Sequence, residues 1–61
     1  MKITDLRIGD WVQDKVQKFP MYVVGLWGDP ERPDKGTVTL DFDDNEGDVW
    51  EAEVEDLERC N

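Results

Sequence analysis

The side chains with the most chemical potential in this chain are its carboxylates. The sequence holds 16 Asp and Glu residues against 7 Lys and Arg, which gives a formal net charge of −9. Ten of the acids lie in residues 41–61, where Arg59 is the one basic residue, so this segment carries the whole net charge. Direct binding to DNA or RNA phosphates requires a basic face and is disfavoured. Such an acidic surface either keeps a small protein soluble or receives a basic partner.

The segment DFDDNEGD at residues 41–48 has the oxygen-rich composition of a calcium-binding loop. When the twelve-residue calcium pattern begins at the first Asp, Glu46 takes the position of the required Gly and Ala52 that of the bidentate Glu. When it begins one residue later, Phe42 occupies the first ligand position. We therefore expect no dedicated metal site, and one Cys without any His disfavours zinc.

Catalytic side chains are scarce. The chain has no His and no Ser, which removes Ser–His and Cys–His nucleophilic pairs and the usual general base. Cys60 lies near the end of the sequence beside Glu58, and acidic surroundings disfavour a reactive thiolate. We predict no catalytic residue, no cofactor and no enzymatic activity. A single Cys and the lack of a long apolar run favour a cytoplasmic protein that does not enter a membrane.

Residues 37–54 show the alternation of polar and apolar residues that is typical of a β-hairpin with one buried face. A three-residue loop at residues 45–47, closed by Gly47 with a positive φ, would pair Phe42 with Trp50. The same register places four acidic residues on the outer face. This predicted acidic wall consists of Asp41, Asp43, Glu51 and Glu53, with Asp41 directly opposite Glu51.

The rest of the chain predicts further short strands. Residues 11–16 and 19–27 read as strands, and Gly25 interrupts the second as a bulge that lets Leu26 enter the core. Residues 28–36 are expected to form an exposed loop. Residues 55–60 read as one helical turn followed by a short last strand.

These elements predict a single all-β domain over residues 1–61, a small SH3-like barrel of four to five antiparallel strands with a short helical turn near the C-terminus. A three-stranded sheet packed on an N-terminal helix is the alternative. The predicted core consists of Val12, Val23, Val38, Leu40, Phe42, Trp50 and Leu57.

Large aromatic residues outside that core have two interpretations. The alternation leaves Trp11, Tyr22 and Trp27 outward or half exposed, where they either cover the ends of the barrel or bind an extended peptide. We predict a binding module, a monomer or weak homodimer, that engages a protein or peptide partner through these three residues. The alternative is that the acidic wall mimics nucleic acid and inhibits a DNA-binding host protein.

The opening LRIGDWV, residues 6–12, resembles the start of small uncharacterised bacterial proteins, often encoded by phages or prophages, that begin Leu-Arg-Ile-Gly-Asn/Asp-x-Val. Their Val-x-Gly-Ile strand end is similar to VVGL at residues 23–26, and a later segment is similar to VEDLE at residues 54–58. The chain departs from them at residues 59–61, where their proline-containing continuation is absent. The resemblance implies an SH3-like fold and a phage-related origin, but no biochemical activity.

Overall fold

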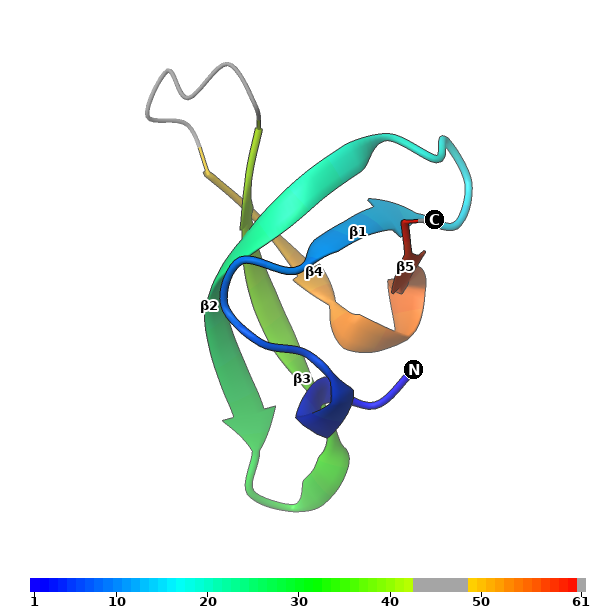
Figure 1. The fold of residues 1–61 in the computed structure, drawn as a ribbon. Helices are drawn as coiled ribbons and strands as arrows, with labels where there is room; N and C mark the ends of the chain where they lie inside the picture. Colours follow the sequence, from blue (N-terminus) through cyan, green and yellow to red (C-terminus); the bar gives the residue numbers. More distant parts are fainter. Residues whose placement is uncertain (43–48, 61) are drawn as a thin grey trace.

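The computed structural model describes residues 1–42 and 49–60, and they form one antiparallel sheet with the strand order β4-β3-β2-β1-β5 (Figure 1). Its strands are β1 (Trp11–Asp14), β2 (Pro20–Asp29), β3 (Arg32–Asp41), β4 (Val49–Glu53) and β5 (Leu57–Arg59). Two 3-10 turns accompany them, η1 (Ile3–Asp5) before β1 and η2 (Val54–Asp56) before β5.

The predicted all-β class is confirmed, as are the five antiparallel strands and the short helical turn before the last one. The sheet curls around its core as a small barrel does, and its edge strands in the described part of the chain are β4 and β5 (Figure 1). The alternative with a packed N-terminal helix is wrong, because the N-terminal element is the single turn η1.

The core is aliphatic. Its buried side chains are Ile3, Leu6, Val12, Met21, Val23, Val38, Leu40, Val54 and Leu57. Burial is confirmed for five of the predicted core residues, and it is wrong for Trp50, which is 50% exposed. Phe42 is only partly buried against the core. Ile3 of η1 and Val54 of η2 join the core, because these turns fold their apolar side chains under the sheet.

The register of the β3–β4 hairpin differs from the predicted one. Leu40 lies opposite Trp50 and Asp41 opposite Val49, so the pairing is displaced by two residues, and the predicted pairs of Phe42 with Trp50 and Asp41 with Glu51 are wrong. Side chains alternate with period two, so this displacement leaves every residue on its predicted face, and alternation could not distinguish the two registers. The predicted loop at residues 45–47, with its positive φ at Gly47, lies outside the described residues.

A bulge in β2 confirms another prediction. The pairing with β3 steps from Val23–Leu40 to Gly25–Thr39, which leaves Val24 as an extra residue. Beyond the bulge Leu26 lies opposite Val38 and packs against the core. The alternation therefore changes phase at this point of β2.

The predicted exposed loop over residues 28–36 is wrong, because β2 and β3 continue through most of it and join at residues 30–31. The close approach of the β2 backbone and of η1 explains the glycine at the base of this extension. A Cβ on Gly36 would lie 2.3 Å from the carbonyl oxygen of Trp27 and 2.5 Å from Cδ1 of Ile3. The missing side chain lets η1 pack directly on β3.

Leu40 provides a test of the core. Leu40→Ala should cost about 2–5 kcal/mol of unfolding free energy, because it empties a fully buried site. A domain of this size has only a few kcal/mol to lose, so we expect the variant to be largely unfolded in urea titrations read by circular dichroism. Val49→Ala, on the exposed start of β4, is the control and should unfold near the wild-type midpoint. A wild-type midpoint for Leu40→Ala would contradict the packing.

The β1–β2 connection is organised by Asp14. Its carboxylate accepts hydrogen bonds from the backbone N–H groups of Gln17 at 2.6 Å and Phe19 at 3.0 Å. The Gln17 bond first and the Phe19 bond second lower the pKa of Asp14 below its ordinary value of 3.8. The ionised carboxylate therefore holds the chain as it turns from β1 into β2.

This connection should make stability depend on pH. Because the pKa of Asp14 is lowered in the fold, its stabilisation is present above the ordinary value of 3.8 and is lost as pH falls through the folded value. Asp14→Asn should melt at a lower temperature than wild type near neutral pH, and the difference should shrink in acid. A difference in melting temperature that stays constant into the acid range would show that the carboxylate charge has no such role.

Candidate functional site

Trp11 and Tyr22 form an aromatic pair on the outer face of the sheet. They lie opposite each other in β1 and β2, next to the buried pair of Val12 and Met21, so alternation points them away from the core. The ring centroids are 5.4 Å apart with an interplanar angle of 61°, an edge-to-face contact. Trp11 is 44% exposed and Tyr22 is half-buried, as the sequence predicts.

Trp27 lies on the same outer face because the β2 bulge changes the phase of the strand. Its indole Nε1–H donates to Oγ1 of Thr39 at 2.9 Å. A Cβ on Gly25 would lie 3.2 Å from this nitrogen, so the glycine leaves room for the indole to lean back along β2 in the direction of Tyr22. Trp27 is 63% exposed. Trp11, Tyr22 and Trp27 are called the aromatic strip below.

Asp41 is not the exposed acid that the sequence predicts. It is 9% exposed and lies opposite Tyr22, between β2 and β4. The Tyr22 hydroxyl donates to Oδ2 of Asp41 at 3.3 Å, and the Phe42 backbone N–H donates to Oδ1 at 2.7 Å. The Asp41 carboxylate thereby helps to hold the ring of Tyr22, a member of the aromatic strip, in place. Asp43, the next member of the predicted wall, lies outside the described residues.

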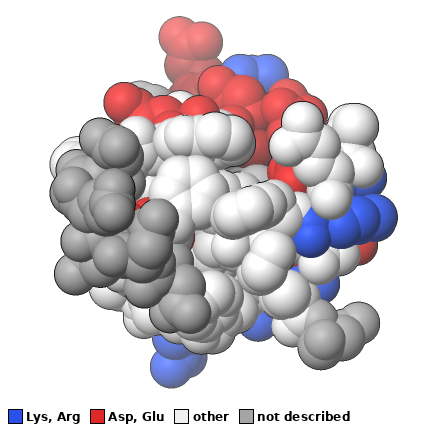
Figure 2. Space-filling view, turned by 90° about the horizontal axis from the view of Figure 1, so that it is seen from above, with Lys and Arg blue, Asp and Glu red and all other residues white. Residues whose placement is uncertain are grey.

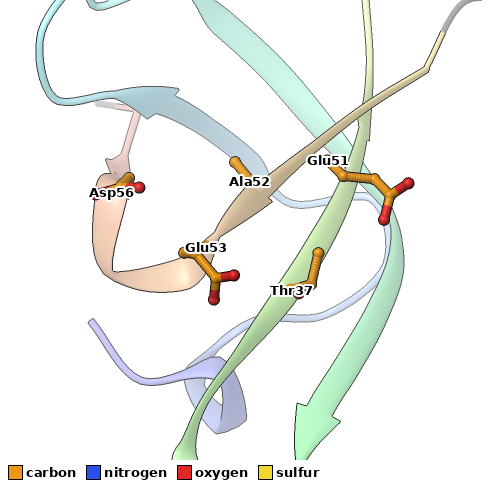
Figure 3. Close-up of a pocket in the computed structure, with 5 residues that line it drawn as sticks. All are labelled: Thr37, Glu51, Ala52, Glu53 and Asp56. Atoms are coloured by element: carbon orange, nitrogen blue, oxygen red, sulfur yellow. The ribbon is translucent and has the colours of Figure 1, made fainter.

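Glu51 and Glu53 lie on the outer face of β4 as predicted, and both are exposed. They line a shallow open hollow with Thr37, Ala52 and Asp56 (Figure 3). Figure 3 shows the two glutamate side chains on one side of β4 and Ala52 on the other. Within the part of the chain that the structure describes, no ion pair reaches Glu51 or Glu53. These two residues are called the acidic strip below.

The two strips share one face of the sheet and are separated by β3. Gly25, Thr39 and Glu51 form one row across the strands, and Trp27, Thr37 and Glu53 form the next. Strands lie about 4.8 Å apart, so the strips run side by side at roughly 10 Å. The two threonines between them are shorter than the side chains on either side. The hollow lined by Thr37, Glu51 and Glu53 lies between the acidic strip and Trp27, whose indole reaches over β3 to Thr39. This part of the outer face is called the trough below.

A second group of aromatic residues was not predicted as a surface. The Phe42 ring lies between those of Phe19 and Trp50, with centroid distances of 5.2 Å to Phe19 and 5.1 Å to Trp50 and nearly perpendicular ring planes. They lie where β2 and β4 begin and β3 ends, and Phe19 and Trp50 are exposed. Figure 2 looks down on the upper end of Figure 1, where uncharged side chains fill the middle and acidic ones gather along one side. Phe42 and Trp50 thus touch through their rings although they are not paired in the register, and Trp50 is exposed rather than buried.

Other carboxylates are engaged in ion pairs. Lys35 donates to the Glu55 carboxylate at 3.0 Å and lowers the pKa of Glu55. The pKa of Glu58 is lowered by a hydrogen bond from Lys18 and by a second one from Gln13. Cys60 is half-buried, and its thiol donates to the side-chain oxygen of Gln13 at 3.6 Å. Residues 1–42 and 49–60 contain no group of three His, Cys, Asp or Glu side chains that could hold a metal ion. The described surface therefore offers aromatic rings and unpaired carboxylates to a ligand.

Comparisons with protein families, with curated proteins and with solved structures find no match to this chain. The resemblance of residues 6–12 to small phage-type proteins therefore stays a prediction. In the described portion there is also no helix with the length and apolar character needed to cross a membrane.

The position of Trp27 can be tested through its hydrogen bond. Thr39→Val keeps the shape of the side chain but removes the acceptor, so the Trp27 indole N–H should shift upfield in a ¹H–¹⁵N spectrum and exchange faster with water. The indole signals of Trp11 and Trp50 are internal controls and should stay in place. An unchanged Trp27 signal would contradict the contact over β3.

Proposed function

We propose that this protein is a non-enzymatic binding module that holds a protein or peptide partner against the aromatic strip. One observation carries the proposal: Trp11 and Trp27 remain exposed on the face that bears Tyr22, while the core is completed by aliphatic side chains. Trp and Tyr are the residues that most often dominate binding energy at protein interfaces. The single cysteine favours a reducing, cytoplasmic setting for this interaction.

The aromatic strip is held in place before any partner arrives. The Trp11 ring packs edge-to-face on Tyr22, the Tyr22 hydroxyl reaches Asp41, and the Trp27 indole is bonded to Thr39. Side chains that are already ordered lose little conformational entropy on binding. A strip with three such constraints suits recognition better than three freely rotating rings.

Nucleic-acid mimicry by the acidic wall is the less supported function. Asp41 is buried and bonded to Tyr22, which removes one of the four proposed phosphate substitutes. Glu51 and Glu53 recur along β4 every ~6.6–6.8 Å, the spacing of alternate strand residues. Duplex DNA presents one charge per ~1.7 Å of its axis. The charge density of this strand is thus far below that of the ligand it would imitate.

The proposal is tested by affinity capture from a bacterial host lysate, with mass spectrometry of the retained proteins. Trp11→Ala and Trp27→Ala should each reduce recovery of the specific partner by about tenfold or more, since truncation of a central aromatic residue costs at least ~2 kcal/mol. Both side chains lie outside the core, so both variants should keep a cooperative melting transition.

Trp50→Ala is the matched control, because it removes a tryptophan of similar exposure from the aromatic group that Trp50 forms with Phe19 and Phe42 at the end of the sheet. Recovery of the partner should survive this substitution. Loss of the partner in Trp50→Ala, with normal recovery in the other two variants, would assign binding to the end of the sheet. Loss only on neutralising Glu51 and Glu53 would favour the mimic.

A further inference from the structure

The charges around the outer face indicate what kind of partner it receives. Four of the basic side chains are engaged with other carboxylates, in the pairs Lys18–Glu58, Arg32–Asp29, Lys35–Glu55 and Arg59–Asp10. Glu51 and Glu53 have no such partner among the described residues, and Glu53 lies across Thr37 from Trp27, which is 63% exposed. The acidic side of the trough is thus left without a counter-charge.

We propose that the trough binds an extended, positively charged segment of a partner protein, with Lys or Arg at alternate positions. This inference rests on the proposed function and specifies the partner of the same face. The segment lies over Thr37 of β3 and beside β4, along the direction of the strands. Its charged groups meet Glu51 and Glu53, and its aliphatic stems and cations lie against the indole of Trp27.

The spacing supports an extended segment. Glu51 and Glu53 are two residues apart on one strand, so their carboxylates repeat at ~6.6–6.8 Å, which is also the repeat of alternate side chains in an extended peptide. The two strips stand on strands that are two spacings apart, roughly 10 Å, and the Trp27 indole reaches part of the way across, so the remaining width admits one extended chain but not a packed helix of ~10–12 Å diameter. Indole faces also attract Lys and Arg cations. One cationic side chain can therefore satisfy both sides of the trough.

The same charges exclude two other occupants. A second copy placed on this face would bring its own Glu51 and Glu53 against those of the first, and like charges at contact distance oppose pairing. Nucleic acid would bring phosphates against the same carboxylates. A cationic peptide is the occupant that both sides of the trough favour.

The test uses a fluorescein-labelled nine-residue peptide of alternating Lys and Thr, titrated with the whole protein at 0.15 M salt and followed by anisotropy. At that ionic strength the Debye length is about 8 Å, so long-range attraction to the net charge is screened. The matching peptide of alternating Glu and Thr should not bind. Amide shifts in ¹H–¹⁵N spectra should fall on β2, β3 and β4.

The decisive variants compare charge in the trough with charge elsewhere. The double variant Glu51→Gln with Glu53→Gln should bind the Lys–Thr peptide about fivefold or more weakly, since each exposed ion pair contributes up to ~1 kcal/mol. Glu31→Gln with Asp34→Asn removes the same two charges at the exposed tip of the β2–β3 hairpin, and should change binding by less than about twofold. Trp27→Ala should weaken binding of the Lys–Thr peptide as well. Melting curves should show that all these variants are folded.

Three results would overturn the inference: an equal loss in both double variants, binding of the Glu–Thr peptide or of labelled duplex DNA to this face, or shifts confined to the end of the sheet. The proposed function is judged separately by the captured partner. If Trp11→Ala and Trp27→Ala lose that partner while the Glu51/Glu53 variant keeps it, binding at the aromatic strip is supported and the inference of a cationic segment fails. If the tryptophan variants keep it, the proposed function itself fails.

Discussion

The bulge at Val24 is the constraint on which both the core and the outer face depend. An uninterrupted β2 would continue its alternation from Met21 and Val23, which would turn Leu26 outward and Trp27 into the core. The extra residue reverses both directions, so that Leu26 packs against the core and Trp27 joins Tyr22 outside. One residue therefore completes an aliphatic interior and assembles an aromatic exterior.

The ion pairs are unevenly distributed over the sheet. Basic side chains pair with carboxylates on the connections and strand ends, such as Lys18 with Glu58 and Arg32 with Asp29. The carboxylates of the acidic strip stay without ion pairs in the described residues and lie on an edge strand, where charge also opposes pairing with other chains. A single strand thus carries charge on the sheet edge and forms the acidic side of the trough.

Alternation and the Gly25 interruption were enough to predict the all-β class, the faces of most strand residues and the phase change in β2. They could not predict the β3–β4 register, because a displacement by two residues satisfies the same pattern. The burial of Asp41 depends on that register and on the Tyr22 hydroxyl across β2, which is a tertiary contact. The exposure of Trp50 also depends on the register, because Trp50 lies near the start of β4 opposite Leu40 and packs on Phe42 at the end of the sheet.

The edge-to-face contact of Trp11 with Tyr22 also gives the molecule an optical property. Tyr22 is the one tyrosine of the chain, and its ring centre lies 5.4 Å from that of Trp11. At this separation the energy absorbed by the phenol passes to the indole before it can be emitted. We therefore expect weak tyrosine emission from the folded protein and a rise in that emission when β1 and β2 separate on unfolding. The protein carries its own label-free emission signal for the opening of the strands that present the aromatic strip.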